Sequence, residues 1–238
     1  MRLLWAGMVF TMVALAQTDA TLQKTYDSYL AALKANDVQA VLKQMTKESG
    51  EGLASWAPPA KLGALLKDIA KDTVPSSYEL QFVWRSKDGK QAAMMALATV
   101  PPDSFHAPKG HEAGAEVKAE VTVSFAQEAG VWKVGDVKID RSINERPKPK
   151  DLNMGKRDDY RDRANTTLGG VVLRLEKQAA GTVYVIKLVD EEAAVFLPAA
   201  KVSPAFVPGS IISFDAASHD NDPQKYWAES AQPAEYQF

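Results

Sequence analysis

The chain has 238 residues, of which 46% are hydrophobic and 24% are charged, and its formal net charge is −2. This composition is typical of a globular protein, and the length suits one large or two small domains. Such a balanced charge indicates no basic surface of the kind that binds nucleic acid. Because the chain contains no cysteine, disulfides, thiolate nucleophiles, iron–sulfur clusters and cysteine-ligated zinc are excluded.

Residues 1–16 have the pattern of a secretory signal peptide. A positive start, Met1-Arg2, precedes the uncharged apolar run Leu3–Ala16, which ends in small residues. This run is shorter than the roughly 20 residues of a membrane span, although a buried helix or an anchor is the alternative reading. We therefore expect cleavage before Gln17 and a periplasmic or secreted protein. No later segment is apolar and long enough to predict a membrane span.

Three helices are predicted next. The first covers Thr21–Ala35, where apolar residues recur every three or four positions and form one stripe: Leu22, Tyr26, Tyr29, Leu30 and Leu33. Asp37 is a favourable N-cap for a second helix, which we expect to end near Ser49-Gly50. A third helix is expected to begin at Pro58-Pro59 and to stop before Pro75.

From Tyr78 the hydrophobic period changes to that of strands. In Tyr78–Ser86 the alternation predicts one face with Tyr78, Leu80, Phe82 and Trp84. The Asp88-Gly89 turn leads into a returning strand, Gln91–Val100. After a loop rich in proline and glycine, 115–127 and 131–139 form a second hairpin around Gly130. Residues 17–140 are thus predicted to be an α+β domain with an antiparallel sheet.

Two segments of this domain resemble the NTF2-like superfamily, also called the cystatin-like α+β cone. They are TYDSYLAALKANDVQAVLKQMT (Thr25–Thr46) and VTVSFAQEAGVWKVGDVKI (Val121–Ile139). The resemblance covers roughly Thr21–Asp140 and implies a curved sheet wrapped around helices, with a pocket at the open end. The superfamily contains isomerases, dehydratases and cyclases as well as non-catalytic binding and structural modules, so the fold alone implies no activity.

The second half of the sequence predicts a linker and a small β domain. Residues 141–168 include proline-spaced RPKPK and the sign-alternating GKRDDYRDRAN, which indicate an extended, solvated connector or an electrostatic docking segment. Five short strand patterns follow within 169–238 and favour a small all-β barrel of the OB or SH3-like kind. Residues 151–238 carry nine basic and thirteen acidic residues, so this half is mildly acidic.

Two polar clusters are candidate metal or catalytic sites. His106 and His111, with Glu112, lie among prolines and glycines at a spacing that fits no helical metal pair, which favours a loop. The stretch SHDNDPQKYW (Ser218–Trp227) is expected to be a turn between strands, with a weak cation or partner contact as the alternative. No nucleophile elbow or phosphate-binding loop is present. We therefore predict no metal, no cofactor and no catalytic residue.

The aromatic residues of the first domain are the candidate ligand site. Five of them could line the pocket, with Arg85 as its polar contact: Tyr26, Tyr29, Trp56, Phe82 and Trp84. Ordinary core packing is the alternative role of these side chains. The sequence favours an exported, non-catalytic protein that binds a small apolar ligand or an envelope protein, with a homodimer left open. The alternatives are an isomerase- or lyase-type enzyme acting in the same pocket and a purely structural role.

Overall fold

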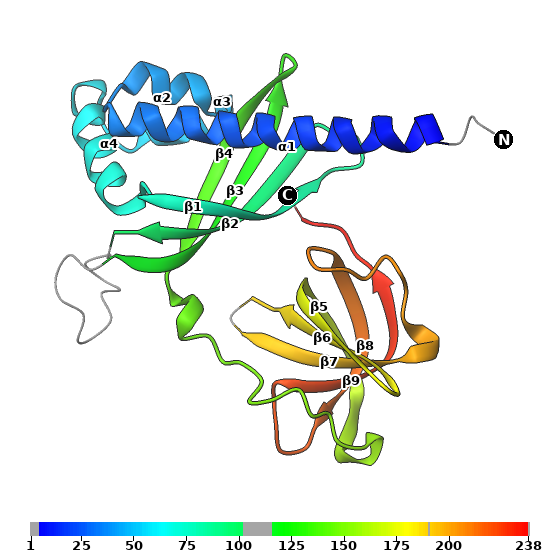
Figure 1. Cartoon of the computed structure of the whole chain (residues 1–238). Helices are drawn as coiled ribbons and strands as arrows, with labels where there is room; N and C mark the ends of the chain where they lie inside the picture. Colours follow the sequence, from blue (N-terminus) through cyan, green and yellow to red (C-terminus); the bar gives the residue numbers. More distant parts are fainter. Residues whose placement is uncertain (1–4, 102–115, 190, 238) are drawn as a thin grey trace. The chain divides into compact units, whose positions relative to one another are not determined.

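The computed structural model describes residues 5–101, 116–189 and 191–237. The chain divides into two compact units, with the division between Ile143 and Asn144. Each unit has its own hydrophobic core. Figure 1 shows the elements and their labels. The chain is α+β, with helices and an antiparallel sheet in the first unit and strands in the second.

The first unit places four helices on one side of a four-stranded sheet (Figure 1). The helices are α1 (Trp5–Lys34), α2 (Val38–Gln44), α3 (Lys47–Ser55) and α4 (Pro59–Thr73). The predicted helix Thr21–Ala35 is the second half of the longer α1, and α4 begins at the Pro58-Pro59 pair and ends before Pro75, as predicted. In the described part of the chain, no helix has both the length and the apolar character that crossing a bilayer requires.

The second predicted helix is in fact two helices, α2 and α3, which corrects the expected end at Ser49-Gly50. Asp37 caps α2 as predicted, since its Oδ1 accepts a hydrogen bond from the Ala40 amide (3.0 Å). The break comes at Thr46, whose N–H donates to the Val134 carbonyl (2.8 Å) and whose Oγ1 accepts from the Ser49 amide (3.2 Å). A side-chain cap and a bond to the sheet together replace continuation of the helix.

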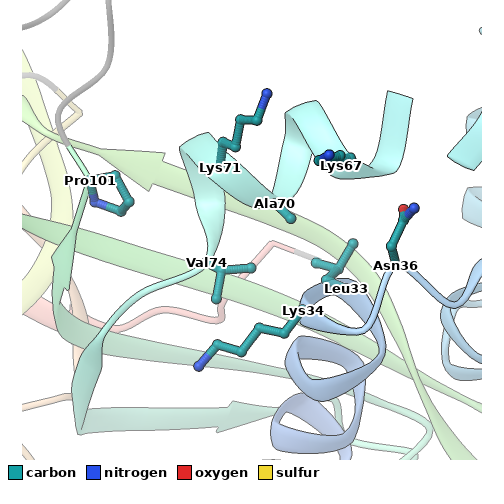
Figure 2. Close-up of a pocket in the computed structure, with 8 residues that line it drawn as sticks. All are labelled: Leu33, Lys34, Asn36, Lys67, Ala70, Lys71, Val74 and Pro101. Carbon is teal, nitrogen blue, oxygen red and sulfur yellow. The ribbon is translucent and has the colours of Figure 1, made fainter. Parts of the chain in front are cut away.

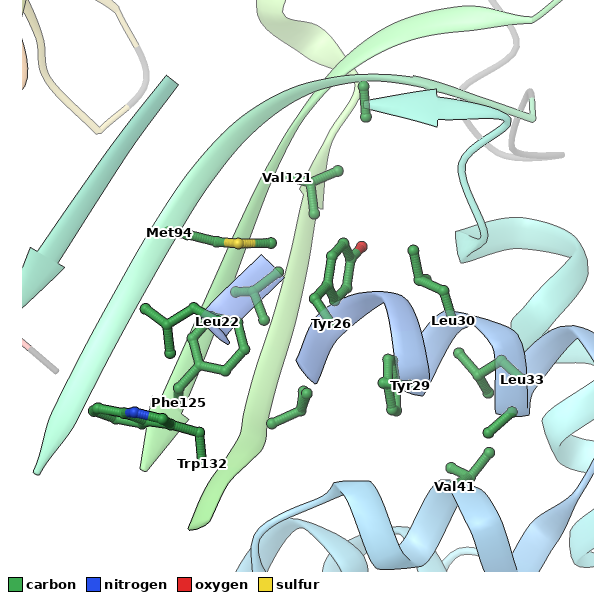
Figure 3. Close-up of a cluster of buried hydrophobic side chains, with 14 of the residues drawn as sticks. Leu22, Tyr26, Tyr29, Leu30, Leu33, Val41, Met94, Val121, Phe125 and Trp132 are labelled. Atoms are coloured by element: carbon green, nitrogen blue, oxygen red, sulfur yellow. The ribbon is translucent and has the colours of Figure 1, made fainter. Parts of the chain in front are cut away.

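The sheet is an antiparallel meander in the order β1-β2-β3-β4. Its strands are β1 (Ser77–Arg85), β2 (Gln91–Val100), β3 (Val117–Glu128) and β4 (Val131–Asp140). Both hairpins turn at the predicted glycines, Gly89 and Gly130, which adopt positive φ. Figure 3 shows the resulting core: side chains of α1 such as Leu22 and Tyr26 face residues of the sheet such as Val121 and Phe125.

A register shift in β1 changes which aromatic residues face the core. Pairing with β2 shifts between Leu80 and Phe82, so Phe82 lies opposite Met95 and Val83 lies opposite Met94. Such a bulge adds one residue and moves every later side chain to the other face. Tyr78, Leu80 and Val83 pack against the core, whereas Phe82 and Trp84 do not. The predicted single face for Tyr78, Leu80, Phe82 and Trp84 is therefore wrong beyond Leu80.

The second unit is a closed ring of five strands in the order β5-β6-β7-β9-β8. All neighbouring pairs are antiparallel except β7 and β9, which are parallel. The bounds are β5 (Tyr160–Gln178), β6 (Gly181–Lys187), β7 (Glu192–Pro198), β8 (Ile211–His219) and β9 (Lys225–Pro233). The first strand thus begins at Tyr160, ahead of Gly169, where the sequence placed the start of the β domain.

A short segment packs against the ring from within the region that was expected to be linker. Leu152 and Met154 join a cluster separate from the main core of the unit. The residues that β6 and β7 contribute to this cluster alternate with those that they contribute to the main core. They therefore lie on the face of these strands that is turned away from the main core. Three consecutive carbonyls of the segment accept hydrogen bonds from Gln178 Nε2, Lys225 Nζ and the Tyr160 hydroxyl: Leu152 O (3.0 Å), Asn153 O (2.9 Å) and Met154 O (2.6 Å). Part of the expected linker is therefore fixed to the second unit.

The stretch Ser218–Trp227 contains the turn between β8 and β9, as predicted. The turn is closed by short-range hydrogen bonds, including those from the Asn221 amide to His219 Nδ1 (3.0 Å) and from the Gln224 amide to Asp222 Oδ1 (3.2 Å). Asp220 also pairs with Arg161 (2.8 Å). The polar side chains of the stretch therefore serve the turn and its ion pairs.

Candidate ligand-binding cavity

A cavity of about 540 Å³ lies in the first unit, between the helices and β4. Its wall is formed by α1, α3, α4, β4 and the residues that flank them, and most of its lining is apolar. The lining residues are Tyr26, Tyr29, Leu30, Leu33, Met45, Glu48, Ser49, Gly52, Leu53, Trp56, Leu66, Ile69, Thr73, Val134, Gly135, Asp136 and Val137. A concave apolar site with a few polar groups is the usual form of a small-molecule pocket.

Helical spacing brings two tyrosines of α1 into the cavity wall. Tyr26 and Tyr29 are three residues apart, so they lie on one face of the helix. Their ring centroids are 6.4 Å apart with nearly parallel planes, and Tyr78 from β1 meets the Tyr26 ring edge-on at 5.4 Å. Both α1 tyrosines are buried in the core. The aromatic wall is therefore continuous with the hydrophobic core of the unit (Figure 3).

The Tyr26 hydroxyl is a buried polar group without a hydrogen-bond partner among the described residues. The residue is fully buried, and that burial raises the pKa of Tyr26 above its usual range, with smaller contributions from Tyr29, Tyr78 and Asp27. A buried hydroxyl without a partner costs free energy, on the order of 1–3 kcal/mol. A ligand that bonds to this hydroxyl would recover that cost.

Tyr29 is also a neutral tyrosine at physiological pH. Burial raises the pKa of Tyr29 to about 12, and the negative charge of Asp136 contributes in the same direction. Asp136 is itself an exposed residue of the cavity lining. The cavity therefore combines a neutral, mostly apolar interior with a carboxylate at its solvent-exposed side.

The α2–α3 break positions the part of the cavity wall that α3 supplies. Because Thr46 bonds to Val134 of β4, α3 starts beside that strand. The amide of Lys47 in addition donates to Glu128 Oε1 of β3 (2.8 Å). These bonds place the exposed residues Glu48 and Gly52 in the lining. Helical periodicity alone predicts one helix in place of α2 and α3, so this wall was not expected from the sequence.

An irregularity in β4 positions the opposite wall. The register with β3 shifts between Val123 and Phe125, next to the Val134–Val137 segment. The Asp136 amide donates to Ser124 Oγ (2.7 Å). A Cβ at Gly135 would lie 2.7 Å from the same Ser124 Oγ, so any larger residue here would displace this hydroxyl. Glycine inside a strand often marks a bulge, and the V-G-D stretch was the signal that sequence analysis did not use.

The structure brings together three of the six predicted site residues. Tyr26, Tyr29 and Trp56 line the cavity, and Trp56 is 74% exposed. Phe82 and Trp84 lie beyond the β1 bulge and away from the core, with their ring centroids 6.1 Å apart. Arg85 places its guanidinium over the Trp132 ring at 5.8 Å and does not line the cavity. The bulge explains why Phe82 and Trp84 do not contribute.

A second hollow of about 560 Å³ also lies along the C-terminal half of α4 (Figure 2). It is lined by Leu33, Lys34, Asn36, Lys67, Ala70, Lys71, Val74 and Pro101. Figure 2 shows Lys34 and Lys71 extending in different directions, so their ammonium groups do not converge on one point. Lys71 is already paired with Asp68 (3.0 Å). This hollow is a weaker candidate than the cavity beside the α1 tyrosines.

The described residues contain no cluster of three or more histidine, aspartate or glutamate side chains that could hold a metal ion. The aspartates of the β8–β9 turn are engaged with neighbouring groups, as described above. His106, His111 and Glu112 lie outside the described residues. The chemistry available in the cavity is therefore that of tyrosine, serine and threonine hydroxyls, two exposed carboxylates and apolar side chains.

No family model and no curated protein matches the chain. Among solved structures, the chain is similar to an NTF2 variant, Rd1NTF2_05, with 14% identity and a TM-score of 0.35, covering 51% of this chain and 98% of that one. It is also similar to a protein from Xanthomonas campestris described as a calcium/calmodulin dependent protein kinase II association domain (14%, TM-score 0.32, covering 52% and 85%). A third similarity is to the Ifi202 HINa domain in complex with double-stranded DNA (9%, TM-score 0.28, covering 68% and 98%).

The chain is thus similar to NTF2-like structures over about half its length. A similarity of fold does not specify an activity, which depends on the residues of the site.

Proposed function

We propose that the protein is an exported, non-catalytic binding protein that holds a small apolar ligand in the cavity of its first unit. One observation carries the proposal: a cavity of about 540 Å³ with a mostly apolar lining from three helices and one strand. This volume lies within the range of small-molecule sites, about 300–1,000 Å³. Export rests on the signal-peptide pattern of residues 1–16.

The driving force for binding would be burial of apolar ligand surface. Leu30, Leu66 and Ile69 offer aliphatic contact, and the two α1 tyrosines offer an aromatic wall. Each square ångström of apolar surface removed from water contributes about 25 cal/mol. The exposed Trp56 side chain lies at the lining, where it could cover a bound ligand.

An isomerase- or lyase-type enzyme is the second candidate. The observation in its favour is the pair of neutral tyrosines, whose hydroxyls could donate to a carbonyl oxygen in a reaction. Such an enzyme also needs an acid or base positioned at the substrate, and that group is usually desolvated. Among the described lining residues there is no histidine, and the two carboxylates, Glu48 and Asp136, are exposed. These features favour binding without catalysis.

The second unit fits an OB-like barrel better than an SH3-like one. Numbered along the unit, its ring order is 1-2-3-5-4 with strands 3 and 5 parallel, consistent with the five-stranded Greek-key barrel of OB folds. OB folds bind oligonucleotides or oligosaccharides on the face of strands 2 and 3. Here that face, on β6 and β7, packs with Leu152 and Met154, and the unit is mildly acidic. We therefore propose a protein-contact role for the second unit rather than a nucleic-acid role.

The test uses the chain from Gln17 and N-phenyl-1-naphthylamine, a neutral apolar fluorophore. We expect saturable binding and a rise in apparent melting temperature. Gly52→Phe supplies the matched variant, because Gly52 lines the cavity and a Cβ there meets no atom within 4 Å. The added ring should abolish binding without loss of fold, whereas Gly52→Ala should keep both. Equal binding by the wild-type and Gly52→Phe proteins would contradict the proposal.

A further inference from the structure

The cavity lining has an uneven charge. It contains two carboxyl side chains, Glu48 and Asp136, and no lysine, arginine or histidine belongs to the described lining. Both carboxylates belong to exposed residues, whereas Tyr26 and Leu66 in the same lining are buried. The negative charge therefore lies on the solvent side of an apolar cavity.

Neighbouring lysines neutralise this charge only in part. Lys138 Nζ lies 4.0 Å from Asp136, in a pair whose side chains are both largely exposed. Such pairs contribute little and are screened by salt. The nearest lysine along α3, Lys47, is directed to Glu51 at 3.9 Å. No hydrogen bond or ion pair engages the Glu48 carboxylate within the described part of the chain.

The second observation is the Tyr26 hydroxyl on the buried side of the cavity. The Tyr26 side chain is fully buried and lines the cavity, and its hydroxyl finds no partner among the residues that the structure describes. Buried polar groups in proteins are nearly always hydrogen-bonded, to protein, water or ligand. An unsatisfied hydroxyl at this place is what a polar atom on the inner end of a ligand would satisfy.

From these two observations we infer that the cavity takes a cationic amphiphile, with its ammonium group beside Glu48 and Asp136 and a neutral oxygen at its inner end bonded to the Tyr26 hydroxyl. This rests on the proposed function and specifies its ligand. Anionic amphiphiles such as fatty acids are disfavoured, because their head groups would meet two carboxylates. Between its two ends the ligand has an apolar hydrocarbon segment, which contacts the aliphatic and aromatic side chains of the cavity wall.

The test compares ligands of one length below their micelle concentrations, by displacement of N-phenyl-1-naphthylamine. Decyltrimethylammonium should bind about fivefold to tenfold more tightly than decyl sulfate, with 1-decanol between them. The Glu48→Gln/Asp136→Asn variant should bind decyltrimethylammonium less tightly and leave 1-decanol unchanged. Glu51→Gln, in the same helix but outside the lining, is the matched control and should change neither.

The inner end is tested with 10-hydroxydecyltrimethylammonium. Its terminal hydroxyl should increase affinity for the wild-type protein and decrease affinity for Tyr26→Phe, relative to decyltrimethylammonium. The inference is overturned if decyl sulfate binds as tightly as the ammonium, if the double carboxylate variant has no effect, or if the hydroxyl effect is the same in Tyr26→Phe. If none of the ligands displaces the probe and the probe itself does not bind, the proposed function fails as well.

Discussion

The Lys225 ammonium lies 2.6 Å from the Asp151 carboxylate and 2.9 Å from the Asn153 carbonyl. The Lys225 side chain is only 9% exposed, and Asp222 is a further neighbour at 3.6 Å. A buried lysine thus holds the segment 151–154 against the second unit. Breaking charged hydrogen bonds of this kind usually costs about 1.5–3 kcal/mol.

Lys225→Met is therefore expected to lower the free energy of unfolding of the second unit by about 2 kcal/mol. Urea denaturation checks this value. The matched control is Lys71→Met, because Lys71 forms an ion pair of similar length with Asp68 in which both side chains are largely exposed. That control should change stability by well under 1 kcal/mol. Equal effects of the two substitutions would show that the segment is not held by Lys225.

The same pair predicts a dependence of stability on pH. The hydrogen bond from Lys225 lowers the pKa of Asp151 below its usual range, with help from the Asn153 amide. A carboxyl with a lowered pKa in the folded state stabilises the protein above its unfolded pKa of about 3.9, and this stabilisation is lost as the pH falls through the lowered value. Asp151→Asn should be less stable than wild type at pH 7, and the difference should shrink on acidification below about pH 4. A difference independent of pH would exclude the ion pair as its cause.

At alkaline pH, Tyr29 should make the free energy of unfolding depend on pH in the opposite direction. Its pKa is raised to about 12 by burial and then by Asp136, whereas an unfolded tyrosine titrates near pH 10. The neutral form of Tyr29 therefore stabilises the folded state. This contribution is complete below about pH 10 and is lost as the pH rises toward 12. Each such tyrosine contributes a slope of roughly 1.4 kcal/mol per pH unit in that window. Tyr29→Phe should remove one such contribution from the slope measured by denaturant unfolding, and an unchanged slope would indicate that Tyr29 is solvated.

Gly135 and Ser124 should be energetically coupled. An alanine Cβ at Gly135 would meet Ser124 Oγ at 2.7 Å and displace the hydroxyl that accepts from the Asp136 amide. Gly135→Ala is expected to cost about 1–2 kcal/mol of unfolding free energy. Because Ser124→Ala removes both the clash and the bond, the double variant should be more stable than the sum of the two single effects predicts. Strict additivity in this double-mutant cycle would contradict the described geometry.

Sequence periodicity was sufficient for the part of the cavity that α1 supplies. Tyr26 and Tyr29 were predicted because an uninterrupted helix keeps residues three apart on one face, and the structure has that helix. Phe82 and Trp84 were misplaced because a bulge between Leu80 and Phe82 reverses the alternation. No glycine or proline in YELQFVWRS signals this bulge, so pairing with β2 determines it.

The remaining wall of the cavity depends on contacts between distant segments. Thr46 ends α2 by bonding to Val134, which lies far along the chain. Local helical periodicity continues through this point, and the Thr46 side-chain cap acts together with this tertiary bond to interrupt it. In the second unit, the proline-spaced composition of 141–168 suggested a linker, but Met154 finds a buried site beside Tyr160 and Trp227. Composition alone does not predict that this segment packs against the second unit.

The central claim is that the cavity beside α1 binds an apolar ligand, and methyl NMR tests it most directly. On addition of 1-decanol, chemical-shift changes should concentrate at the methyl groups of Leu30, Leu66 and Ile69, which line the cavity. Gly52→Phe should abolish these changes. If the methyl groups of these three residues do not respond, or if the changes are confined to Leu152 and Met154 in the second unit, the claim is contradicted.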